Sequence, residues 1–273
     1  MTTEKLPFRE KFAYGFGDLA SVLYWQTFMA YILFFYTDVF GITAAAAGTM
    51  LLVTRLWDGV NDPMMGVIAD RTETRWGRFR PYLLWLCVPF AVMGVLTFTT
   101  PDLSGGGKLV WAYVTFTLLM MLYTAINIPY SALLGVVTAD PVERAQVSSI
   151  KFIFAYTAGM IVSFTLLPMA ARLGAGNDQR GWQLSFVVYD IAAVCFFLIA
   201  FIFVRERIKP VAKERTPIRQ DLKDLLRNRP WVMLLLTTIT MILFIASRLT
   251  VTAHYFKYYV CLLYTSPSPR DLN

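Results

Sequence analysis

Residues 81–100 read PYLLWLCVPFAVMGVLTFTT, a stretch that contains no charged side chain. A helix needs about 20 mainly apolar residues to cross the hydrocarbon core of a lipid bilayer. Six further runs of similar character lie along the 273-residue chain, at about 12–37, 44–69, 109–138, 147–171, 183–204 and 231–259. The sequence therefore predicts an all-α membrane protein that crosses the bilayer several times.

Charged residues are concentrated in the connections between these runs. They make up only 16% of the chain, against roughly 25% in average soluble domains. The N-terminus and the even-numbered connections hold most of the Lys and Arg residues, whereas the other connections hold only Lys108, Arg172 and Arg180. Because cytoplasmic loops carry an excess of positive charge, we expect a multi-pass inner-membrane protein with a cytoplasmic N-terminus. This bias explains the net charge of +7 without nucleic-acid binding.

The chain offers little that an enzyme would need. His254 is the only histidine, so no Ser/His/Asp or Cys/His catalytic set can be assembled. The sequence contains no glycine-rich phosphate loop and no metal-ligand spacing, and we expect no cofactor. The first run, 12–37, is predicted to be a retained helix rather than a cleaved signal, because it is long and holds Asp18 and Gln26.

The order of runs and connections predicts the domain organisation. Residues 1–204 form a bundle of six helices, 205–230 a charged cytoplasmic linker, and 231–260 a seventh helix that begins a second bundle. Within the linker, 218–229 has the spacing of an amphipathic surface helix. The composition then changes abruptly to CLLYTSPSPRDLN at 261–273, where 261–271 look like a translated sequencing adapter or, alternatively, a natural polar tail. We therefore expect a fragment of a protein almost twice as long.

The second run contains ionisable residues in the sequence RLWDGVNDP, residues 55–63. Arg55, Asp58 and Asp62 are spaced at i, i+3 and i+7, which places them on one helical face. Asn61 adds an amide oxygen next to Asp62. Two carboxylates one turn apart in a low dielectric repel, so one binds a proton or both share a cation. The alternative is that Arg55 and Asp58 form a buried salt bridge that only fixes helix packing.

The first run carries a second polar stripe. Asp18, Ser21 and Trp25 follow the same i, i+3, i+7 spacing. An acidic group beside an indole ring is typical of sugar sites, where hydroxyls bind the carboxylate and the apolar sugar face lies on the ring. The alternative is anchoring at the membrane interface by aromatic residues.

The fourth run contains YTAINIPY, residues 123–130, where Thr124 and Asn127 are one turn apart. Pro129 frees a backbone carbonyl one turn earlier, which an ion or ligand can use, although the proline can also serve only as a packing kink. Lys151, at the start of the fifth run, is either a snorkelling residue at the membrane surface or a charge that faces the acids of a cavity.

These motifs resemble a known family. YGFGDLAS (14–21), FFYTDVFG (34–41), RLWDGVNDPMMG (55–66), DRTETRWGRFRPYLL (70–84) and YTAINIPYSAL (123–133) are similar to the glycoside–pentoside–hexuronide:cation symporters of the major facilitator superfamily. The resemblance covers residues 8–260. It implies the major facilitator fold and alternating access, in which a coupling cation and a sugar bind together and two bundles rock about them.

The resemblance also implies roles for individual residues. The matching positions for the coupling cation, Na⁺ or H⁺, are Asp58, Asn61, Asp62 and Thr124. Tyr123 matches a sugar-site tyrosine, and the expected substrate contacts are completed by Asp18, Ser21, Trp25, Asn127 and Lys151. Residues expected to hold the inward and outward states are Arg55 and, in the loop that follows the second run, Asp70, Arg71, Arg75, Arg78 and Arg80.

Three positions depart from the melibiose-permease pattern within this family. Val22 stands in place of an acidic sugar ligand, Asn127 in place of an aspartate and Ser131 in place of a tryptophan. The sequence is more similar to the branch that takes xylosides, glucuronides and related sugars, and the sugar stays open. We expect the complete protein to be a monomer, and residues 1–260 alone not to transport. Cation-coupled lysolipid transport, or a sensor or scaffold that binds a partner through the charged linker, are the alternatives.

Overall fold

The computed structural model describes residues 5–208 and 224–258, with the backbone alone at 242 and 245–258. The chain divides into two units, Met1–Pro210 and Val211–Asn273. Most of the predicted linker lies outside the described residues, including 218–223 of its expected surface helix. The terminal segment 261–273 lies outside them as well.

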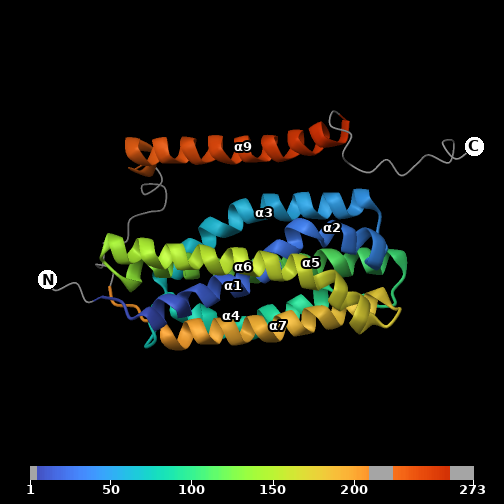
Figure 1. Cartoon of the computed structure of the whole chain (residues 1–273), viewed down its shortest axis with the longest axis horizontal. Coiled ribbons are helices and arrows are strands. Elements are labelled where there is room, and N and C mark those ends of the chain that lie inside the picture. The colour runs from blue at the N-terminus through green and yellow to red at the C-terminus, as the bar shows by residue number, and fades with distance from the viewer. Residues whose placement is uncertain (1–4, 209–223, 259–273) are drawn as a thin grey trace, which may run out of the picture. The chain divides into compact units, whose positions relative to one another are not determined.

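Long helices make up almost all of the described chain, and the prediction of an all-α fold is confirmed (Figure 1). The first unit contains α1 (Phe8–Ala30), α2 (Ile32–Phe34), η1 (Phe35–Phe40), α3 (Ala44–Arg71), α4 (Arg80–Thr97), α5 (Gly105–Val137), α6 (Pro141–Gly174) and α7 (Asp178–Phe203). In this bundle α1 packs on α6 and α7, α4 packs on α5 and α7, and α3 packs on α5. The second unit contains α9 (Arg229–Tyr258).

Four described helices, α4 to α7, are long and apolar enough to cross a membrane. A fifth span results if α1 is counted together with α2 and η1, from which it is bent by 61°. This bend, at Tyr31, differs from the single run predicted over 12–37. Helix α3 is not among these spans because Arg55, Asp58 and Asp62 interrupt its apolar sequence.

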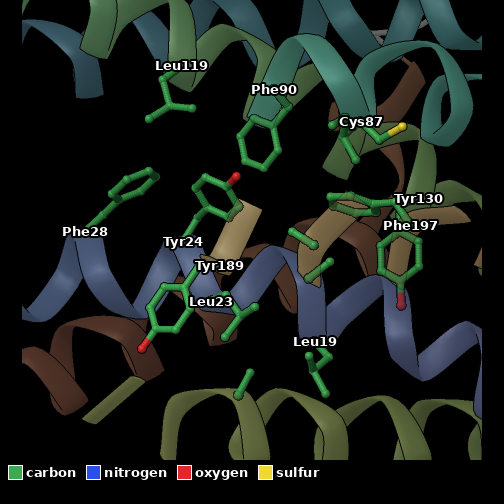
Figure 2. Close-up of a cluster of buried hydrophobic side chains, with 14 of the residues drawn as sticks. Leu19, Leu23, Tyr24, Phe28, Cys87, Phe90, Leu119, Tyr130, Tyr189 and Phe197 are labelled. Carbon is green, nitrogen blue, oxygen red and sulfur yellow. The ribbon is translucent and has the colours of Figure 1, made fainter. Parts of the chain in front are cut away.

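Aromatic side chains fill the centre of the bundle. Tyr24 projects from α1 toward Phe90 of α4 (Figure 2), and their ring centroids are 4.1 Å apart. Phe98, which caps α4, stacks on Phe186 of α7. All four of these rings are almost completely buried. The core therefore fixes α1 against α4 and α7, and this sets the face of α1 that points toward α3 and α5.

Ion pairs fix the beginning of α1. Lys11 Nζ lies 2.7 Å from Glu143 Oε2 of α6. Glu10 accepts two hydrogen bonds from the guanidinium of Arg207, at 2.5 and 2.7 Å, and a third from the backbone N–H of Arg205. Buried carboxylates are stable only when they are paired in this way. These contacts fix the position of α1 along its own axis within the bundle. They therefore also fix the position of its polar stripe, Asp18, Ser21 and Trp25.

Candidate functional site

A cavity of about 510 Å³ lies between α1, α3 and α5. Nine of the residues expected to bind ligands or to gate line it: Asp18, Ser21, Trp25, Arg55, Asp58, Asp62, Tyr123, Thr124 and Asn127. The other lining residues are Val22, Gly59 and Met120. The polar stripes of three separate helices thus meet in one place. Asn61 and Lys151 lie outside this lining, although each neighbours a residue within it.

Oxygen atoms gather where α3 faces α5. The hydroxyl of Thr124 donates a hydrogen bond to Asp62 Oδ1 at 2.9 Å, and this bond joins the two helices. One carboxylate oxygen of Asp58 and the amide nitrogen of Asn61 are buried without a hydrogen-bond partner. The Asp58 oxygen is an acceptor that lines the cavity and is available to a cation, whereas the Asn61 nitrogen is a donor and is not.

The backbone of α3 adds a further acceptor to this set. The helix continues through Pro63, which has no N–H to donate to the carbonyl of Gly59 four residues earlier. Gly59 itself lines the cavity. In the described part of the chain no group of three or more His, Cys, Asp or Glu side chains is arranged to hold a metal ion. A cation at this position would therefore combine the carboxylates with hydroxyl and carbonyl oxygens, which are the ligands that hard cations prefer.

Arg55 connects α3 to the aromatic wall of the cavity. Its guanidinium lies 4.8 Å from the ring centroid of Trp25, which in turn stacks on Tyr123 with the centroids 5.7 Å apart. Its Nη1 atom is also 3.5 Å from Asp58 Oδ2, so the salt bridge considered as an alternative is present. The Arg55 side chain is 42% exposed, and a long ion pair with that exposure contributes little to stability.

Lys151 reaches the cavity wall from α6. Its Nζ atom lies 3.5 Å from Asp18 Oδ1 and 5.8 Å from the ring centroid of Tyr130. This position agrees with a charge that faces the acids rather than with a snorkelling residue. Asp18 is 9% exposed, so Lys151 balances an otherwise costly buried charge.

Two polar residues of the lining bond to their own helices. Ser21 Oγ donates to the Gly17 carbonyl at 3.0 Å, and Asn127 Nδ2 donates to the Tyr123 carbonyl at 3.0 Å. A hydroxyl that donates still has lone pairs, and the side-chain oxygen of an amide remains an acceptor. Both residues therefore present acceptors to the cavity.

The expected gating residues of the loop after α3 lie away from this lining. Asp70 and Arg71 are exposed at the end of α3. Arg75 lies over the ring of Trp76, at 4.3 Å from its centroid. Arg78 and Arg80 border a second cavity, of about 590 Å³, together with Arg75. Arg55 is thus the one member of the expected gating set that lines the first cavity.

Sequence reasoning missed several buried or partly buried acids: Glu10 and Glu143 of the ion pairs described above, Asp190 and Glu206. Asp190 of α7 is 3% exposed and accepts a hydrogen bond from the Tyr24 hydroxyl. An ionisable residue inside the apolar run 183–204 was the signal that could have found it. Glu206 accepts hydrogen bonds from three consecutive backbone N–H groups at the start of α4, and no local pattern in the sequence indicates this contact.

Comparison with known proteins gives consistent matches along the chain. Residues 13–262 match the family model described as MFS/sugar transport protein. The inner membrane symporter YicJ of Escherichia coli (strain K12) is 42% identical over 248 residues, which cover 91% of this chain and 54% of the relative. The isoprimeverose transporter of Lactiplantibacillus pentosus is 40% identical over 256 residues, which cover 93% of this chain and 53% of the relative.

These relatives carry the names of transporters and symporters rather than of enzymes. The chain spans about half the length of the curated relatives it matches. The apolar helices of this chain and its similarity to an inner membrane symporter together identify a multi-pass membrane protein.

Proposed function

The chain belongs to the MFS/sugar transport protein family, as its resemblance to the glycoside–pentoside–hexuronide:cation symporters indicated, and we propose that the complete gene product carries a sugar or glycoside together with Na⁺ or H⁺. The observation that carries this proposal is the single cavity in which the acidic stripe of α3, the aromatic stripe of α1 and the polar face of α5 meet. The relative named as an isoprimeverose transporter supports a glycoside as the substrate.

The coupling cation binds between α3 and α5. Asp58 and Asp62 supply negative charge, Thr124 supplies a hydroxyl, and the carbonyl of Gly59 lacks its helical donor. The amide of Asn61 lies beside this set and completes the polar surroundings. A bound cation offsets the repulsion between the two carboxylates. It therefore stabilises the arrangement in which α3 lies close to α5.

The sugar binds on the other side of the cavity, against α1. The rings of Trp25 and Tyr123 provide an apolar wall, and Asp18 provides an acceptor for sugar hydroxyls. Ser21, Asn127 and Lys151 complete the polar contacts. The two ligands lie in one cavity, and binding of either is proposed to raise the affinity for the other; such coupling is reciprocal.

Transport follows from alternating access to this cavity. The N-terminus and the loop after α3 lie on the cytoplasmic side, where the loop arginines stabilise the closed and open arrangements in turn. Arg55 acts within the cavity itself, since it bridges α3 to the ring of Trp25. The complete protein acts as a monomer in the inner membrane.

Uptake of isoprimeverose and related glycosides by cells that express the complete gene product tests this proposal. We expect accumulation that depends on a Na⁺ gradient or that a protonophore abolishes, and the comparison identifies the cation. Asp62→Asn and Asp58→Asn remove charge at constant shape and should each reduce accumulation at least about 100-fold. Asp102→Asn is the matched control, because Asp102 is exposed in the loop between α4 and α5.

Two results would contradict the proposal. One is full accumulation by the Asp62→Asn and Asp58→Asn variants. The other is uptake that neither a Na⁺ gradient nor a proton gradient affects. Uptake of a lysolipid in place of every glycoside would favour the alternative substrate class.

A further inference from the structure

A buried carboxylate outside the cavity has no part in the proposed function. Asp190 lies in α7 and is 3% exposed. One of its oxygens accepts the hydrogen bond from the Tyr24 hydroxyl of α1, and the other, Oδ2, is buried without a partner. Among the described residues no basic side chain forms an ion pair with it. A full charge in this position would be uncompensated, which is strongly destabilising in a protein interior.

The surroundings of Asp190 are built to accept it. Gly94 of α4 faces the carboxylate, and a Cβ at that position would lie 2.6 Å from Asp190 Oδ1 and 3.0 Å from the Tyr24 ring. Phe90 and Phe186 contact Tyr24 from the same two helices. The space that Gly94 leaves on α4 is thus filled by the hydrogen-bonded pair of Tyr24 from α1 and Asp190 from α7. This is a specific contact between α1, α4 and α7 rather than an accident of packing.

Tyr24 connects this pair to the cavity. Its ring lies against Phe90, as Figure 2 shows, and Phe90 in turn lies 6.2 Å from the ring of Tyr123. Tyr123 lines the cavity and stacks on Trp25, which follows Tyr24 directly in α1. The hydrogen bond to Asp190 therefore fixes the rotation of α1 about its axis at the point where its next residue forms the cavity wall.

We propose that Asp190 is an uncharged carboxylic acid that acts as a positioning residue: it holds Tyr24 by a hydrogen bond and so orients the Trp25–Tyr123 wall against which the sugar binds. The part that concerns the sugar rests on the proposed function. The part that concerns the neutral acid does not, because it follows from burial and from the missing counter-charge alone.

Three variants separate the role of the charge from that of the hydrogen bond. In the complete gene product, Asp190→Asn keeps an acceptor for the Tyr24 hydroxyl and is neutral, so the apparent KM for the transported sugar should stay within about twofold of the original. Asp190→Leu keeps the volume without an acceptor, and Tyr24→Phe removes the donor; each should raise this KM about tenfold. Ser185→Ala is the control in α7, because Ser185 bonds only to the Gly181 carbonyl of its own helix.

An infrared spectrum of the 273-residue chain in detergent at neutral pH provides the second readout. The carbonyl stretching band of a protonated carboxylic acid should be present, and Asp190→Asn should weaken it, since Asp58 or Asp62 can also hold a proton. A band that Asp190→Asn leaves unchanged would overturn the inference. Absence of that band, or equal damage by Asp190→Asn and Asp190→Leu, would overturn the inference, as would an unchanged KM in Tyr24→Phe. If Asp190→Leu does not fold, Tyr24→Phe decides the question. If Asp190→Asn weakens the band but no sugar is carried, the proposed function fails while the neutral acid stands.

Discussion

Glu206 caps the N-terminus of α4, and replacing it should destabilise the bundle. Its carboxylate accepts hydrogen bonds from the backbone N–H groups of Arg78, Phe79 and Arg80, at 2.8, 2.7 and 2.9 Å. The first N–H groups of a helix have no partner within the helix, and the positive end of the helix dipole favours an anion there. Glu206 comes from the segment after α7, so this contact also ties the end of α7 to α4.

The magnitude follows from what remains after Glu206→Ala. Three N–H groups lose a charged acceptor, but the loop around them is half-buried and borders a cavity, so water replaces part of the bonding. The loss of stability should therefore resemble the loss on removing a strong helix cap, and should be smaller than the loss of three independent buried hydrogen bonds. We expect the free energy of unfolding to fall by about 2 kcal/mol.

Glu73 provides the matched control, because it is a glutamate that borders the same cavity as Glu206 but differs in its contacts. Its carboxylate is 3.8 Å from Arg78 and its side chain is 82% exposed. Glu73→Ala should cost less than about 0.5 kcal/mol. Both free energies can be measured by denaturant unfolding of the purified chain in detergent micelles, followed by circular dichroism. Equal losses for the two variants would refute the assignment of Glu206 as the cap of α4.

Three further predictions concern other parts of the bundle. Gly77 and Gly176 both have a positive φ, of 115° and 93°, so Gly176→Ala should lower the free energy of unfolding by about 1 kcal/mol. Gly77→Ala should lower it further, because a Cβ at Gly77 would strike a neighbouring carboxylate and one at Gly176 would not. Equal losses of unfolding free energy would contradict this. Arg55→Lys keeps the charge but loses the planar group over Trp25, so the apparent KM for the sugar should rise roughly three- to tenfold, and an unchanged uptake curve would show that the stacking has no role. Glu10→Ala removes the acceptor of three hydrogen bonds and should lower the free energy of unfolding by about 2 kcal/mol or more, whereas no change would show that these bonds merely replace bonds to water.

The site residues that could be predicted from the sequence alone are those related by helical periodicity, which acts between residues close together in the chain. Asp58 and Asp62 were placed on one face because the helical period alone relates them, and the cavity contains both. Thr124 could be joined to them only through the family resemblance, because its contact with Asp62 spans 62 positions. Helical periodicity gives the face on which a side chain lies, but it does not give the partner that the face meets.

The contacts that were missed show the same limit. Tyr24 and Asp190 are 166 residues apart, and the apolar runs that hold them suggest burial without indicating which helices touch. The sequence does not predict the bend at Tyr31, because no proline or glycine lies at that position. It becomes visible only when the bundle positions α1 and η1 separately.

The attachment of α3 explains how ligands in the cavity could be coupled to movement. Among the described residues α3 packs on α5 and on the short elements α2 and η1, whereas α1 is held by α6 and α7 as well as by its ion pairs. Helix α3 reaches α1 only across the cavity, through Arg55 and the ring of Trp25. On the proposed function, a cation at Asp62 and Thr124 would strengthen the link from α3 to α5, and a sugar beside Trp25 would change the link from α3 to α1. We therefore expect α3 to respond to both ligands while α1 remains fixed, which is the differential contact that coupling between two sites requires.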